Sequence, residues 1–214
     1  MTERVEKTLA FLKGKFESTE YFQKDPTQKN YRFEHSVRVA NIAAQIARAE
    51  GMDEELMTIA GLLHDVGYGQ DFPDDYDWNN HGRDGAHVAR PFLEELGLSD
   101  GEINNICYAI AIHVDDKADF EWERTAFSET VGDADNIDRF DTYRIYETVK
   151  YKVFEELDLG GRIDWLRERL ANLERLRGFR FGTQTAIALW QEKLDFQAEF
   201  FGRMLRQMEA SRME

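Results

Sequence analysis

Apolar residues three and four positions apart run through most of this chain, and only three prolines interrupt it. Such spacing places apolar side chains on one stripe of an α-helix. In one of these rows His35 is followed by Val39, Ile42 and Ile46, in steps of four, three and four. No segment shows the alternation of a half-buried strand. The sequence therefore predicts an all-α fold.

Helix caps and irregular segments divide these rows. One helix is expected to end at Gly51, and the next runs from an N-cap at Asp53 to His64-Asp65, with Gly67 suited to the C-terminal cap. Ser99 and Glu102 form a capping box before a row of isoleucines that ends at His113. Acidic loops are expected at 70–80 and 115–123. Further helices are expected at about 84–96, as a short helix leading into 132–135, at about 136–157 and 163–176, and from about 183 over about 26 residues.

The charge of the chain limits its partners. It has 42 Asp and Glu against 27 Lys and Arg, a formal net charge of −15. This balance disfavours a nucleic-acid polymer or an anionic membrane surface, and a phosphate would need local attraction by a metal and a few basic side chains. Without a signal-peptide core or a run of about 18 apolar residues, we expect a cytoplasmic protein. The single cysteine, Cys107, is predicted to be a small buried hydrophobe.

Histidines and aspartates stand on or at the ends of several apolar rows, namely His35, the pair His64-Asp65, His113 and the late Asp135. Buried imidazoles and carboxylates need partners, and one divalent cation satisfies several of them. Four of the five histidines, His81 included, could share such a centre, whereas His87 is taken as a bystander. The mixed nitrogen and oxygen donors suit Mn, Fe, Co, Ni, Zn or Mg, and the pattern indicates a metallohydrolase.

The order of these residues resembles the HD-domain superfamily of metal-dependent phosphohydrolases, in particular the small bacterial HD hydrolases. The resemblance rests on His35 with Arg38 three residues on, and on the stretches GLLHDVGYG, NHGRDGAHVA, AIAIHVDD and GDADNID, within about residues 30–140. It implies an HD-domain helical bundle whose metal ligands are His35, His64, Asp65 and Asp135. His81 and His113 would ligate a second ion, with Asp65 bridging, or bind substrate phosphate.

Length and composition favour a single HD-type domain over residues 1–214, because no Pro/Gly/Ser-rich linker divides the chain. The core motif region lies at about 30–140, and the helices at about 141–210 are expected to pack on it. The last helix, about 26 residues long, could instead form the seam of a homodimer.

Catalytic roles are less well defined than ligand roles. Some family members carry an acidic residue three positions after the aspartate of the His-Asp pair, but this chain has Tyr68 there. The general base is then Asp84 or a metal-bridging hydroxide, with Asp65 both ligand and catalytic residue. Candidates for binding substrate phosphate are Arg38, which could equally form a surface ion pair, and the motif neighbours Arg83, Lys117 and Arg139. Asp133 and Asp138 flank Asp135 and could cap helices or orient ligands.

We therefore expect a phosphohydrolase that acts on a small phosphorylated metabolite, with a nucleotide as the first choice, by attack of a metal-bound hydroxide on phosphorus. A di-iron oxygenase is the main alternative, since HD relatives that cleave carbon–carbon or carbon–phosphorus bonds use the same order of six ligands. Two irons and a requirement for oxygen would distinguish it. A non-catalytic binding module ranks last, because it would need a broken ligand set.

Overall fold

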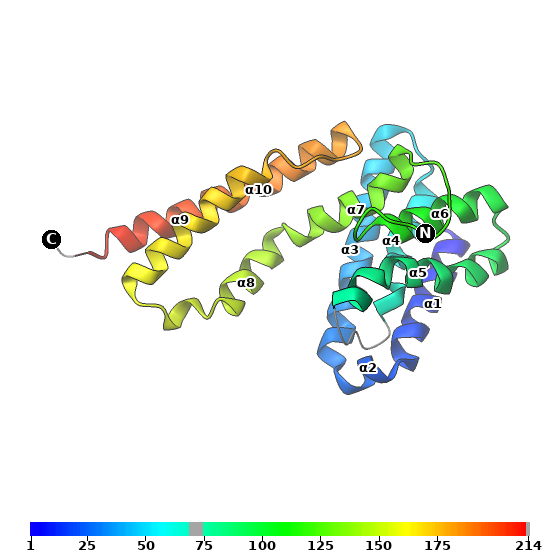
Figure 1. The fold of residues 1–214 in the computed structure, drawn as a ribbon, viewed down its shortest axis with the longest axis horizontal. Helices are drawn as coiled ribbons and strands as arrows, with labels where there is room; N and C mark the ends of the chain where they lie inside the picture. Colours follow the sequence, from blue (N-terminus) through cyan, green and yellow to red (C-terminus); the bar gives the residue numbers. More distant parts are fainter. Residues whose placement is uncertain (69–74, 213–214) are drawn as a thin grey trace. The chain divides into compact units, whose positions relative to one another are not determined.

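The computed structural model of the chain describes residues 1–68 and 75–212, and of residues 75–77 only the backbone. Helices dominate these described segments, which contain no strand (Figure 1). The predicted all-α fold is thus confirmed. Within the same segments, no helix combines the length and the apolar run that a bilayer crossing requires.

The chain divides into two compact units. Unit 1 comprises Met1–Asp138 and Phe181–Ala186, and unit 2 comprises Arg139–Arg180 and Ile187–Glu214. Each unit is described by itself below. The expectation of a single HD-type domain, with the C-terminal helices packed on its core, stays a prediction.

Unit 1 begins with three helices, α1 (Glu3–Ser18), α2 (Glu20–Lys24) and α3 (Pro26–Glu50). The buried face of α3 contains His35 together with Val39 and Ile46, as the periodicity predicted. Gly51 ends α3 in the left-handed conformation, with φ of 72°, and its N–H bonds to the carbonyl of Ala47. The predicted helix end is therefore confirmed.

Helix α4 (Glu54–Leu63) delivers the His-Asp pair. Asp53 caps its N-terminus by accepting from the N–H of Leu56 at 2.9 Å, as expected. The prediction for Gly67 is wrong, because His64 occupies the C-cap and Gly67 lies inside the short 3-10 helix η1 (Val66–Tyr68). Gly67 is needed for close packing, since a Cβ there would lie 2.7 Å from the backbone nitrogen of Gly85.

Helix α5 (Asp75–Glu95) starts earlier than the expected Asp84 and contains Pro91. Residues 75–80 of the expected acidic loop are therefore helical, while 69–74 lie outside the described residues. Tertiary contacts explain the difference: the rings of His81 and Tyr68 lie 4.6 Å apart, and the Trp78 indole donates to the Tyr68 hydroxyl at 2.6 Å. These contacts stabilise the first turns of α5, although the sequence there has no apolar periodicity.

Helix α6 (Asp100–Ile112) follows the predicted capping box, and both reciprocal bonds between Ser99 and Glu102 are present. His113 is its C-cap. Cys107 is fully buried, as expected, and burial raises the pKa of its thiol to about 11. Residues 113–125 form no helix, and α7 (Ala126–Arg139) then carries Asp135 in its interior.

The helix expected over 136–157 is divided in the structure into the end of α7, α8 (Thr142–Tyr151) and the 3-10 helix η2 (Phe154–Glu156). Asp141 caps α8 by accepting from the N–H of Thr142 at 2.6 Å. The side chain of Gln197 donates to the carbonyl of Phe140 at 2.6 Å. These bonds satisfy backbone groups at the break, which local periodicity did not reveal.

Unit 2 is completed by α9 (Leu159–Leu176) and most of α10 (Gln184–Glu209). Trp190, Leu194 and Phe201, at steps of four and seven along α10, are buried. The Trp190 indole donates to the carbonyl of Leu176, the last residue of α9, at 2.9 Å. The expected helices from 163 to 176 and from 183 onward are confirmed, although α9 begins four residues earlier.

Substitution of Gly61 by Ala is expected to lower the free energy of unfolding of unit 1 by about 1–3 kcal/mol, since overpacking forces neighbouring backbone to shift. An added Cβ on Gly61 of α4 would lie 2.7 Å from the Cα of Ala40 in α3. Gly14→Ala is the control: nothing lies within 4 Å of its added Cβ, so helix propensity alone should raise stability by roughly 0.5–1 kcal/mol. Thermal unfolding followed by circular dichroism compares the two. An equal increase in thermal stability for Gly61→Ala and Gly14→Ala would contradict the close contact of α3 and α4.

Candidate metal centre

Unit 1 brings together all six residues proposed as metal ligands. They come from α3 (His35), the end of α4 (His64 and Asp65), α5 (His81), the end of α6 (His113) and α7 (Asp135). All six side chains are buried, and that of Asp135 is the most exposed at 11%. Residues up to 100 positions apart in sequence thus form one cluster.

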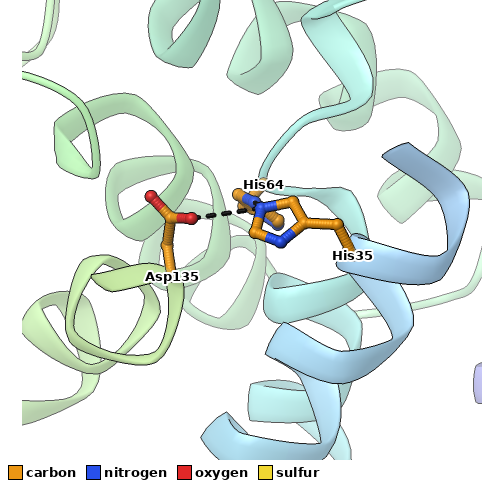
Figure 2. Close-up of side chains that lie close together, drawn as sticks. All are labelled: His35, His64 and Asp135. Atoms are coloured by element: carbon orange, nitrogen blue, oxygen red, sulfur yellow. Dashed lines mark hydrogen bonds and ion pairs between the residues drawn. The ribbon is translucent and has the colours of Figure 1, made fainter. Parts of the chain in front are cut away.

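Two groups of three residues in this cluster have the proximity that a metal ion needs. In the first, the Nε2 atom of His35 lies 3.3 Å from Nε2 of His64 and 3.1 Å from Oδ1 of Asp135 (Figure 2). The second consists of His64, Asp65 and His113. In each group the candidate donor atoms lie within 4.8 Å of one another. His64 is common to both.

Asp65 lies at the centre of the cluster. Its Oδ2 is 3.4 Å from Nε2 of His64 and 3.7 Å from Nε2 of His35. Its Oδ1 is 3.4 Å from Nε2 of His81 and 3.6 Å from Nε2 of His113. Each carboxylate oxygen therefore faces a different pair of imidazoles, which is the placement a bridging carboxylate requires.

The outer nitrogen of each of these imidazoles is already engaged. Nδ1 of His64 bonds to the carbonyl of Gly61 at 2.8 Å, and Nδ1 of His113 bonds to the carbonyl of Ile110 at 2.7 Å. Nδ1 of His81 bonds to the carbonyl of Trp78. A carbonyl can only accept, so in these three rings Nδ1 carries a proton and Nε2 is the atom turned toward the cluster. Converging Nε2 atoms beside two carboxylates form a donor set that fits a divalent cation.

The fourth imidazole, His35, is held by a carboxylate. Its Nδ1 lies 2.7 Å from Oδ2 of Asp138, whose two oxygens also accept from Nε and Nη2 of Arg38 at 2.7 and 3.1 Å. Burial alone lowers the pKa of His35, but its bonds to Asp135 and Asp138 outweigh this and raise the pKa to about 9. Burial would raise the pKa of Asp138, whereas His35 and Arg38 lower it.

Arg32 is a residue of this site that the sequence analysis missed. Its Nη1 donates to Oδ2 of Asp65 at 2.8 Å, and its guanidinium carbon lies 3.6 Å from the centre of the Tyr68 ring. Burial would raise the pKa of Asp65, but His64 and Arg32 hold that pKa well below its usual range. Arg32 precedes His35 by three positions, so the two side chains lie on the same face of α3. This spacing was the one sequence signal that pointed to Arg32.

The other predicted site residues have varied surroundings. Arg83 donates twice to Asp115, at 2.7 and 3.3 Å, and Lys117 lies 3.7 Å from the same carboxylate with a 76% exposed side chain. Arg139 is half-buried at the end of α7. Asp84 is half-buried on α5, three residues after His81 and hence on the same side of the helix.

Two further acidic or basic residues lie apart from the ligand set. Asp133, a neighbour of Asp135 in sequence, accepts from the N–H of Gly182 at 2.8 Å. Burial raises the pKa of Asp133 to about 7. His87 is exposed and pairs with Asp119 at 2.6 Å, which agrees with its expected role as a bystander.

Comparison with known proteins identifies the family of this chain. The HD domain family matches residues 32–143, a range that contains all six clustered residues. A solved structure of a predicted HD superfamily hydrolase from an uncultured Thermotogales bacterium superposes with a TM-score of 0.65 at 22% identity, covering 94% of this chain and 90% of that one. This likeness shows a shared fold.

A curated relative is similar over a shorter range. Ribonuclease Y of Oleidesulfovibrio alaskensis is 35% identical over 83 residues, which are 39% of this chain and 14% of that protein. The chain thus matches a small part of this relative's length. Because the family match extends over more than half of the chain and includes the entire histidine and aspartate cluster, the chain belongs to the HD domain family, a superfamily of metal-dependent hydrolases.

Proposed function

We propose that the chain is a metal-dependent phosphohydrolase that acts on a small phosphorylated metabolite, with a nucleotide as the first substrate class to test. The observation that carries the proposal is the arrangement around Asp65, with an imidazole pair at each carboxylate oxygen. His35, His64, Asp65 and Asp135 would hold one ion, and His81 and His113 would hold a second ion that shares Asp65. A bound divalent ion lowers the pKa of water and polarises a phosphoryl oxygen.

The protein's own side chains would prepare this centre for an anionic substrate. Asp65 stays ionised because Arg32 and the imidazoles hold its pKa low, so both of its oxygens are available as ligands. Asp84, on the His81 side of α5, is the proposed general base, because Tyr68 cannot accept a proton as a carboxylate does near neutral pH.

Basic side chains would bind the substrate's phosphate. The proposed contacts are Arg83, Lys117, Arg139 and Arg38, and the alternative role of Arg38 is to position Asp138, which accepts two hydrogen bonds from it. The guanidinium of Arg83 is already engaged by Asp115, so a phosphate would compete with this carboxylate. Lys117 pairs with the same carboxylate at a longer distance and is far more exposed, which favours it as the first phosphate contact of the two.

The charge of the chain and its similarity to a ribonuclease both bear on the size of the substrate. A net charge of −15 opposes long polyanions and favours a substrate with few phosphates. The similarity to ribonuclease Y, although limited to 83 residues, makes a phosphodiester bond the second substrate class to test. A panel of nucleotides, phosphomonoesters and a short RNA separates these classes.

Metal analysis beside this substrate panel tests the proposal. We expect one or two ions of Mn, Co, Ni, Zn or Mg per chain with release of phosphate, and removal by a chelator should abolish this release. Saturating metal, at about 100 times its Kd, should raise the free energy of unfolding by roughly 2.7 kcal/mol over the chelated protein. Two irons per chain, oxygen consumption and no phosphate release would instead establish the oxygenase.

A further inference from the structure

Unit 2 contains an open apolar groove of about 610 Å³ between α8 and α10. Both helices contribute apolar side chains to its walls, and we call these residues the groove set: Ile145, Tyr146 and Val149 from α8, and Phe196, Phe200 and Met204 from α10. Three members are strongly exposed, Tyr146 at 60%, Phe196 at 51% and Phe200 at 39%. None of these residues belongs to the metal centre, so the groove calls for a separate explanation.

Exposed aromatic side chains that share one groove indicate an interaction site rather than ordinary surface. Scattered apolar residues are normal on a protein surface, but contiguous large ones are costly in water. Along α10, Phe196, Phe200 and Met204 are spaced four apart and therefore form a row beside the buried row of Trp190, Leu194 and Phe201. One apolar face of α10 thus packs inside unit 2, and a neighbouring apolar face lines the open groove.

Charge distinguishes the possible occupants of this groove. Unit 1 has 13 Lys and Arg against 29 Asp and Glu, a net charge of −16, whereas unit 2 has 14 against 13, a net of +1. Two copies of unit 1 repel each other, but two copies of unit 2 do not. Near-neutral surfaces associate more readily, so unit 2 is the part of the chain suited to self-association.

The polar residues of the groove are also self-complementary. Lys150 at the end of α8 and Glu155 in η2 line the same groove and carry opposite charges. In a two-fold dimer the same patch meets itself, so residue i of one copy meets residue j of the other, and the reverse. Lys150 of each copy can therefore pair with Glu155 of the second copy, in two pairs related by the two-fold axis.

We infer that the α8–α10 groove is the interface of a two-fold homodimer, in which the groove set of each copy fills the groove of the other. Aromatic residues are the usual anchors of such interfaces, and here they come from both sides by symmetry. This inference is independent of the proposed reaction, because it concerns unit 2 and no ligand of the metal centre takes part.

Sedimentation of the full chain over a range of concentrations tests the dimer. We expect a wild-type mass of two chains at micromolar concentration, and for Phe196→Glu a dissociation constant at least about 30-fold higher, as for a central anchor. Arg203→Gln is the matched control, because it changes the charge by the same amount at a 74% exposed side chain outside the groove set. It should leave the mass unchanged. A wild-type chain that remains a monomer at roughly 100 μM would overturn the inference.

A charge exchange provides a second test that does not depend on the folding of Phe196→Glu. Lys150→Glu and Glu155→Lys should each weaken the dimer about threefold or more, since each places like charges in both symmetry-related pairs. The double variant should regain most of the wild-type affinity. Failure of the double variant to improve on the single variants would overturn the two-fold pairing.

Discussion

Substitution of Asp65 by Asn is expected to lower turnover at least about a hundredfold and to remove most of the bound metal, with helicity retained. Loss of a partner that merely orients a ligand already costs 10–100-fold in metal affinity or activity, and Asp65 is placed as a ligand. Its two oxygens face four imidazoles within 3.4–3.7 Å. Asn keeps the shape but replaces one oxygen by a donor that repels a cation. His64→Ala should have the same effect, because His64 belongs to both three-residue groups.

Elemental analysis, circular dichroism and activity assays on the same preparations test this expectation. His87→Ala is the matched control, since it removes an imidazole that lies on the surface beside Asp119. It should retain metal and activity. A variant of Asp65 with normal turnover would show that the reaction takes place elsewhere. A variant that loses helicity together with metal would instead make the cluster a structural site, with a stability role that exceeds its chemical one.

The ligand set could be predicted from the sequence because its members interrupt regular patterns. His35 lies on an apolar stripe and His113 ends one, and both prove buried in the structure. A polar residue on a buried stripe needs a partner, and this requirement is visible without coordinates. That these residues approach one another follows from the family resemblance, and the structure gives their distances.

The orienting residues could not be predicted in the same way. Asp138 bonds to His35 across 103 positions, and Arg32 bonds to Asp65 across 33. Such pairs depend on how different helices pack against each other. The periodicity of a single helix carries no information on this packing. The same reason explains the early start of α5 and the break at residues 140–141, where the tertiary bonds of Trp78 and Gln197 decide the local structure.

Arg38 has two possible roles that make different predictions. Its bidentate bond to Asp138 favours a positioning role, in which it fixes the carboxylate that orients His35. The alternative is the proposed contact with substrate phosphate. A positioning residue changes metal affinity, whereas a phosphate contact changes KM.

Asp138→Asn is expected to lower metal affinity about 10–100-fold, because it weakens the bond that fixes the His35 ring and its tautomer. If Arg38 acts through Asp138, Arg38→Gln lowers metal affinity as well, and the double variant is little worse than Asp138→Asn alone, since the two residues form one network. Metal titration of both single variants and the double variant measures this coupling. We expect strong non-additivity with little change in KM. A raised KM for Arg38→Gln at unchanged metal affinity would instead assign Arg38 to the substrate, because only a phosphate contact could then account for its effect.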